Sequence, residues 1–209
     1  MVETSSPPAP EPEPAPAPPV VPRTTIRGSA WLKRKSGDSE VIRGLRILVL
    51  RPSVDRPTLR HCLEEQAARI KRDVEFNKDL ASRYNTPLEE ADAAIDKVKL
   101  SEVDRKLANL PDSMDLAELL EFLCRVDPLK IPSGFGPALD AELVTEAHTS
   151  VDGKFELPNV PGGHYYLHAS ESAQRYFVEW LIPVDAKGEV INVDFENANA
   201  AAIYNIGDR

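Results

Sequence analysis

Residues 151–169 constrain the fold of this chain more than any other stretch. Asp152 and Gly153 form a turn pair, because aspartate supplies a short polar side chain and glycine can adopt a positive φ. Phe155 and Leu157 then alternate with polar residues, as expected for a half-buried strand. The pattern therefore predicts a tight turn followed by a strand with one buried face.

A second strand follows after Pro161-Gly162-Gly163, which interrupts the alternation. The side chains expected on one face of this strand are Tyr165, Leu167 and Ala169. The opposite face carries His164, Tyr166 and His168. Because the two faces differ in polarity, the first is expected to point into a core.

The two strands together resemble the signature of carboxypeptidase regulatory-like domains. The matching residues are Asp152, Gly153, Phe155 and Leu157, followed by Val160, Pro161, Gly163, Tyr165, Leu167 and Ala169. The resemblance is densest over residues 145–170. It implies a seven-stranded β-sandwich of the transthyretin (prealbumin) type, grouped with starch-binding-like folds. It implies no peptidase activity, since family members serve as accessory, adhesive, carbohydrate-binding or surface domains.

Five further segments show strand patterns. They are Thr24–Arg34, Leu45–Arg51, Ala141–Thr149, Gln174–Pro183 and Glu189–Glu196. With the two strands above they make seven, the number in a small sandwich. The predicted fold is therefore mainly β: an antiparallel seven-stranded sandwich interrupted by a helical hairpin or three-helix insertion.

The helical insertion is predicted over residues 53–140. Apolar residues at three- and four-residue spacing indicate a helix over Thr58–Arg83, a second one beginning at Pro87, and a third over Asp115–Val126. In the second helix the apolar stripe moves from one series to another, which predicts a kink or break near Ser101. The two series are Leu88, Ala91, Ile95 and Val98, and then Leu100, Val103, Leu107 and Leu110.

The insertion is expected to pack, at least at its base, on the outer face of one sheet. Leu45–Arg51 is apolar on both faces, but only one face of a strand can look into a sandwich. The side chains left for the outer face are Leu48, Leu50, Phe177 and Leu181. Their exposure would leave an apolar patch that is uncommon on monomers.

Composition divides the chain further. Residues 1–22 form a proline-, alanine- and glutamate-rich linker, residues 23–52 and 141–200 the discontinuous sandwich, and residues 201–209 a tail. The linker tends to extended polyproline II. It is interpreted either as a disordered tail or as a stiff tether, with an anchor expected upstream in the second case.

Net charge limits the partners. The formal charge is −9, which argues against nucleic acid as the main partner, because phosphate binding requires a basic face. No apolar run is long enough to span a bilayer, and no signal peptide is visible. An extracytoplasmic or membrane-tethered location is favoured over a cytoplasmic one.

The histidine and cysteine residues do not form a recognisable catalytic or metal-binding pattern in the sequence. His61 and Glu64 have a zinc-like spacing but lack further ligands. His164 and His168 are too far apart along a strand to chelate one metal by themselves, and the alternative is that His148 joins one of them across strands. No catalytic residue, metal site or cofactor is predicted. Cys62 and Cys124 are interpreted as free thiols, with a disulfide between helices as the alternative.

Three aromatic side chains, Tyr166, Phe177 and Trp31, are predicted to point outward. They lie under the helical insertion, which we favour, or they form a sugar-binding patch. The first function hypothesis is a non-catalytic interaction or structural module of the bacterial cell envelope; the alternative is a carbohydrate-binding accessory domain. A pilin-type isopeptide bond to Asn192 or Asn197 is a further alternative.

Overall fold

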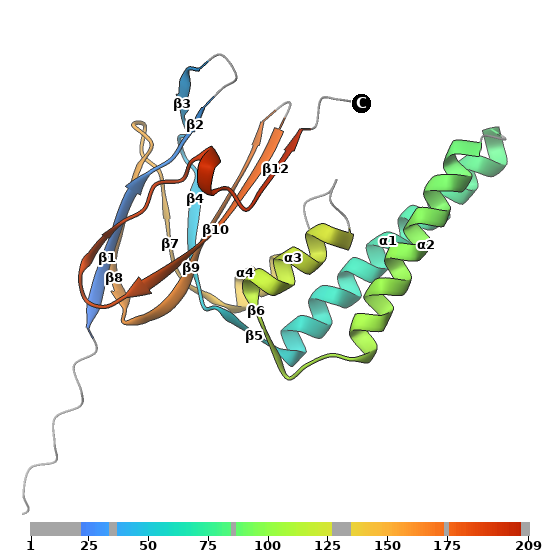
Figure 1. Cartoon of the computed structure of the whole chain (residues 1–209), viewed down its shortest axis with the longest axis horizontal. Helices are drawn as coiled ribbons and strands as arrows, with labels where there is room; N and C mark the ends of the chain where they lie inside the picture. Colours follow the sequence, from blue (N-terminus) through green and yellow to red (C-terminus); the bar gives the residue numbers. More distant parts are fainter. Residues whose placement is uncertain (1–21, 34–36, 85–86, 127–134, 174–175, 206–209) are drawn as a thin grey trace, which may run out of the picture.

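The protein is a β-sandwich with a helical insertion that extends from one side of it (Figure 1). In this computed structural model the described residues are 22–33, 37–84, 87–126, 135–173 and 176–205. The predicted fold class, a mainly antiparallel sandwich interrupted by helices, is confirmed. Within the described part of the chain, no helix has the length and apolarity needed to cross a membrane.

Two sheets make up the sandwich. The smaller sheet has the order β11 (Val190–Asn192), β1 (Arg23–Ser29) and β8 (Lys154–Pro161). The larger sheet has the order β12 (Ala202–Asn205), β10 (Tyr176–Ala186), β9 (Gly163–Ala173), β4 (Arg46–Leu50) and β7 (Leu143–His148). A short ribbon of β2 (Trp31–Lys33) and β3 (Ser39–Val41) stands at one end of the sandwich.

The core between the sheets is built around aromatic rings. Phe195 is fully buried and meets the rings of Trp180 and Phe155 edge-on, with centroid distances of 5.8 Å and 5.6 Å. Edge-to-face pairs stabilise a core beyond the area they bury. The indole N–H of Trp180 donates to the carbonyl of Glu196 at 2.8 Å, so this large side chain leaves no donor unsatisfied.

Three details differ from the sequence-based expectation. The predicted first strand splits at Ala30 into β1 and β2, which belong to different sheets. The last predicted strand is short, and β11 pairs with β1 in parallel rather than antiparallel. The assignment of residues 201–209 to a tail is wrong in part, because Ala202–Asn205 form β12 and satisfy backbone groups along β10.

The described residues of the insertion between β4 and β7 form four helices. They are α1 (Arg56–Tyr84), α2 (Pro87–Ala108), α3 (Leu116–Val126) and α4 (Gly136–Ala141). A two-stranded ribbon of β5 (Ser53–Asp55) and β6 (Ser113–Asp115) lies at the base, where the chain leaves the sandwich. Figure 1 shows α1 and α2 as a long antiparallel hairpin, with α3 and α4 between its base and the sandwich.

Of the kink or break predicted near Ser101, the break is wrong, since α2 runs as one helix from Pro87 to Ala108. The two apolar series that suggested a break lie on two different faces of this helix. Val103 is buried, whereas Ile95 and Val98 are exposed. The helix therefore stays continuous and leaves one apolar series uncovered.

The predicted docking of the insertion on the larger sheet is confirmed at its base. Leu48 and Leu50 of β4 belong to the same buried cluster as residues of α1, α3 and α4. The helical members of this cluster include Leu59, Leu63, Leu119, Leu123 and Ala138. Leu181 of β10 packs against it and is partly buried. The molecule thus has two cores, one inside the sandwich and one between the larger sheet and the helices.

Candidate functional site

The inner face of α2 packs on α1. Ala93 and Val103 are buried there, and Leu100 and Leu107 pack against the helical core. Between them Asp96 accepts hydrogen bonds from the Asn77 amide at 3.1 Å and from Lys99 Nζ at 2.9 Å. This face is therefore closed by apolar contacts and by the polar link from Asn77 to Asp96 across the hairpin.

The opposite face of α2 is open. Ile95 is 54% exposed and Val98 is 70% exposed, and Ala91 and Ala94 beside them are exposed as well. We call the face formed by Ala91, Ala94, Ile95 and Val98 the outer face of α2. Large apolar side chains exposed singly are ordinary, but four of the seven exposed large hydrophobic residues described lie on the outer half of this hairpin. They are Phe76, Tyr84, Ile95 and Val98.

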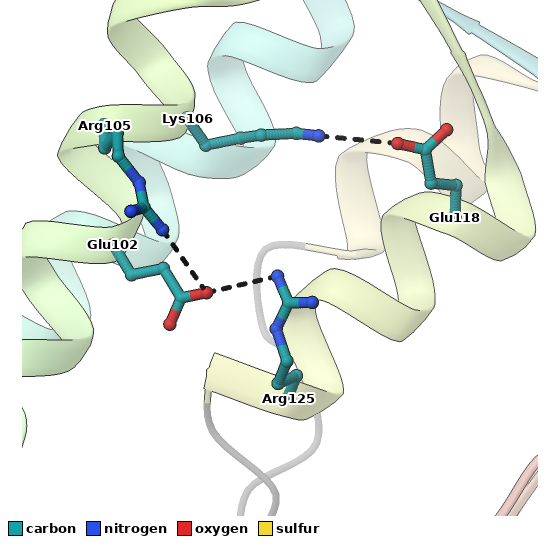
Figure 2. A network of polar contacts seen from close by, with 5 residues as sticks. All are labelled: Glu102, Arg105, Lys106, Glu118 and Arg125. Atoms are coloured by element: carbon teal, nitrogen blue, oxygen red, sulfur yellow. Dashed lines mark hydrogen bonds and ion pairs between the residues drawn. The ribbon is translucent and has the colours of Figure 1, made fainter.

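The outer face begins where α3 stops covering α2. Figure 2 shows the charged side chains that join these two helices. Lys106 Nζ lies 3.4 Å from Glu118, and the Glu102 carboxylate lies 3.1 Å from Arg125, in the last turn of α3. Glu102 also lies 4.0 Å from Arg105. Because Val98 lies one turn and Ile95 two turns before Glu102, they continue the same side of α2 beyond the end of α3.

The ring of Phe122 on α3 also contributes to the contact between α2 and α3. Lys106 Nζ and the Arg125 guanidinium both lie 5.5 Å from the centre of its ring. Cations at this distance are attracted to the face of an aromatic ring. The side chains of Val98, Glu102 and Arg105, with Lys97 and Ser101, also line a shallow hollow of about 430 Å³ next to the contact.

A second group of polar side chains lies under the helices. His168 on β9 and Glu179 on β10 are both buried, and the His168 Nε2 and Glu179 Oε1 atoms are 3.0 Å apart. Phe135 meets the His168 ring edge-on, with 5.7 Å between centroids. This pair sits on the face of the larger sheet that also carries Leu48 and Leu181, so the helical layer keeps it from solvent.

A third feature is a shallow hollow of about 550 Å³ on the sandwich. It lies where β1 and β8 approach the end of β7. The residues that line it are Arg27, Gly28, His148, Ser150, Lys154, Phe155 and Glu156. Arg27 Nε is already 3.1 Å from the Glu156 carboxylate, so part of the polar lining is paired internally.

The three aromatic residues of the predicted sugar-binding patch are not brought together. Tyr166 packs against the helical core and donates its hydroxyl to Asp115 of β6 at 3.0 Å, and burial raises the pKa of this phenol. Phe177 is buried, and its position on β10 is opposite Ser172, whereas Tyr166 is opposite Pro183. Trp31 lies on the separate β2–β3 ribbon. One sugar ring could not contact all three.

The predicted turn and strand residues occupy the positions that the pattern indicates. Gly153 has a φ of 72°, and a Cβ there would lie 2.9 Å from the carbonyl of Ala30. Phe155 is buried. Pro161 ends β8, Gly163 begins β9, and Tyr165 packs against the sandwich core. Asp152 is exposed in the turn. These residues are structural in their placement, and none lines the outer face of α2.

The histidines are dispersed. His61 Nε2 lies 4.0 Å from Glu65 rather than Glu64, His164 Nδ1 lies 3.2 Å from Asp185, and His148 is at the end of β7. Among the residues that the structure describes, no three His, Cys, Asp or Glu side chains are grouped to hold a metal.

The remaining candidate positions have structural surroundings. Cys62 and Cys124 are not joined in a disulfide, and burial raises the pKa of the Cys62 thiol to about 11. The Asn197 side chain accepts from the backbone N–H of Lys33 at 2.6 Å and donates to the Lys33 carbonyl at 3.4 Å. Asn192 ends β11, opposite Arg27.

Sequence reasoning did not identify the outer face of α2. It placed Ile95 and Val98 in one buried stripe with a kink after them. One signal in the sequence could have identified this face. Two apolar series overlap in one uninterrupted helix, and because they lie on different sides of it, only one series can face α1.

Comparison with known proteins adds no family. No protein-family model matches the chain, and no curated protein matches it. A solved structure of a Pseudomonas aeruginosa protein, provisionally described as carbohydrate-binding, aligns with 85% of this chain and 90% of its own, at 11% identity and a TM-score of 0.41. The pilus backbone protein RrgB of Streptococcus pneumoniae aligns with 83% of this chain at 10% identity and a TM-score of 0.26.

These similarities are distant. The alignment covers 41% of the RrgB chain, so this chain corresponds to less than half of that protein. With TM-scores of this size, neither a family nor a function follows from the alignments, and the function must be argued from this chain's own surfaces.

Proposed function

We propose that this protein is a non-catalytic interaction module in which the sandwich is a platform and the helical hairpin is the binding arm. The outer face of α2 carries this proposal. Ile95 and Val98 stay exposed and lie beyond the end of α3. By contrast, Leu100, Val103 and Leu107 of the same helix pack on the helical core. Contiguous apolar side chains on a protein surface mark interaction sites, whereas singly exposed ones are ordinary.

We place the module at the bacterial cell envelope, held by the proline-rich residues 1–22 as a tether. Composition supports this part of the proposal, since alternating prolines give a stiff, extended spacer. A spacer of this kind would hold the module away from the surface to which it is attached.

Site-specific cross-linking in cells of the source organism tests the proposal. A photo-reactive phenylalanine analogue replaces Val98 in one variant and Val151, an exposed residue of a sandwich turn, in the other. We expect a discrete cross-linked product from position 98 and from an envelope fraction. Equal products from both positions, or none, would reject the hairpin as the binding arm. Recovery of the chain only from the cytosol would reject the envelope location.

Carbohydrate binding is the second candidate function. The hollow between β1, β8 and β7 favours it, because Arg27, His148 and Lys154 line it together with Phe155 and can supply hydrogen-bonding groups. A glycan array with the native chain and a variant carrying Lys154→Ala and His148→Ala tests it. Binding that the variant loses would support a sugar site; binding that the variant keeps would place the glycan elsewhere.

A further inference from the structure

We propose that the partner of the outer face of α2 is the outer face of a second copy of the same chain, with the two α2 helices antiparallel. This inference rests on the proposed function, because it names the partner of the same surface. The two observations behind it are the uncovered apolar side chains of this face and the distribution of charge along α2.

The charge distribution is strongly uneven. The first half of the helix, Pro87–Asp96, contains four acidic residues and no basic residue. The second half, Lys97–Ala108, contains four basic and two acidic residues. An antiparallel pair of copies brings the acidic half of each α2 against the basic half of the other, whereas a parallel pair brings like charges together. Opposite charges flanking an apolar seam fix the orientation of paired helices.

Several of these charges are available to a partner. Asp92 and Lys97 are exposed, and the Arg105 side chain is 76% exposed although it lies near Glu102. Lys99 and Lys106 are bound to Asp96 and Glu118 within the same chain. Asp92 is thus an exposed charge of the acidic half, and Lys97 and Arg105 are exposed charges of the basic half.

The apolar part of the face also suits self-pairing. Ile95 and Val98 are separated by one helical turn, so in an antiparallel pair the Ile95 of each copy packs near the Val98 of the other. Ala91 and Ala94 beside them are small, which allows the two helix backbones to approach closely. Each copy would add one helix pair to the other, giving four antiparallel helices in the region that α3 does not cover.

Sedimentation velocity of the purified full chain over a wide concentration range tests self-association. We expect a monomer–dimer equilibrium whose dissociation constant rises at least about tenfold in a variant carrying Ile95→Lys and Val98→Lys. The matched control carries Val151→Lys and Val190→Lys, which change two exposed valines of the sandwich. A monomer at all concentrations, or equal weakening in both variants, would overturn the proposal.

Charge reversal tests the orientation. One variant carries Asp92→Lys and the other carries Lys97→Glu and Arg105→Glu. In an antiparallel pair each variant alone dimerises more weakly than the native chain, and an equimolar mixture recovers dimers, because the reversed halves of different copies are again complementary. Weakening without recovery in the mixture would overturn the antiparallel arrangement. A monomeric chain that still cross-links another protein from position 98 in cells would reject self-association and leave the proposed function standing.

Discussion

The base and the outer half of the helical hairpin use the same two helices but bury their apolar side chains very differently. Near the base, Leu59, Leu63 and Ile70 of α1 are almost wholly buried against α3, α4 and the larger sheet. In the outer half, Phe76 is 61% exposed and Tyr84 is 69% exposed. The comparison shows that the sandwich stabilises only the half of the insertion that it and α3 can reach.

When a helix has a single neighbouring helix, only one of its sides is covered. At the base, every helix has two or more neighbours, so a wide apolar stripe is buried. In the outer half, α1 and α2 have only one another among the described elements, and a second apolar series remains uncovered. The difference therefore points to the outer half as the place where another molecule adds stability.

The largest effect is expected from truncating a side chain at the base. Leu63→Ala should lower the free energy of unfolding by about 2–5 kcal/mol, because it leaves a cavity in a closely packed region. Phe76→Ala, in the outer half of the same helix, should change it by about 0.5 kcal/mol or less in the monomer. Urea denaturation followed by circular dichroism measures both. Equal losses would show that the outer half is packed as tightly as the base.

A similar contrast is expected at the start of the chain. The carbonyl of Pro22 accepts a hydrogen bond from Gly162 N–H at 2.8 Å, so the boundary of the predicted linker moves by one residue. Removal of residues 1–21 should leave the free energy of unfolding unchanged. Removal of residues 1–22 should cost about 0.5–1.5 kcal/mol, the net contribution of one hydrogen bond. If both truncations had the same stability as the full chain, Pro22 would belong with the linker.

The boundary between the two halves of the hairpin is held by Arg125. Arg125→Ala should lower the free energy of unfolding by about 0.2–1 kcal/mol, as for other exposed ion pairs. Arg83, which lies 2.9 Å from Asp79 in the outer half, is the matched control, with about 0.3–0.5 kcal/mol expected.

High salt should affect the two substitutions, Arg125→Ala and Arg83→Ala, differently. It should remove the cost of Arg83→Ala, because that pair is purely an exposed ion pair. It should retain part of the cost of Arg125→Ala, because the guanidinium also packs on the Phe122 ring. Complete loss of both effects in salt would show that the Phe122 contact contributes nothing.

Much of the fold could be predicted from local patterns. The turn at Asp152-Gly153 needs a positive φ, and Gly153 has one. The apolar alternation on both faces of β4 required two covering layers, and the structure supplies the sandwich on one side and the helices on the other. These inferences succeeded because each depended on residues that are close in sequence or on one strand.

The missed features depend on contacts between distant segments. β12 follows no strong strand pattern and forms because β10 offers it an open edge. The parallel pairing of β11 depends on a crossing between sheets, and the buried pair of His168 and Glu179 depends on the register of β9 with β10. The outer face of α2 was missed for a simpler reason: apolar residues at helical spacing were assumed to be buried.

The smallest effect is expected at the neck between the sandwich and the insertion. Glu142 is the C-cap residue directly after α4 and directly before β7, and it is 8% exposed. Burial raises the pKa of its carboxyl group, although the Arg51 guanidinium 3.9 Å away opposes the shift. Since the folded pKa lies above the unfolded value, the ionised carboxylate lowers stability at neutral pH, and this cost disappears as pH falls through the folded pKa.

Glu142→Gln should therefore raise the melting temperature slightly at pH 7, and this advantage should shrink as the pH is lowered toward the unfolded pKa of about 4.3. Asp185→Asn is expected to change the melting temperature at pH 7 in the opposite direction. Hydrogen bonding to Lys187 lowers the pKa of Asp185, so its variant should be less stable than the native chain at pH 7 and should approach it as pH falls. Melting curves of the three proteins from pH 7 to about pH 2 measure both trends, because the stability contributed by Asp185 is lost only below its unfolded pKa of about 3.9. If the advantage of Glu142→Gln instead grew as the pH fell, the folded pKa of Glu142 would lie below its unfolded value. The pairing with Arg51 would then outweigh burial, and the carboxylate would stabilise the neck.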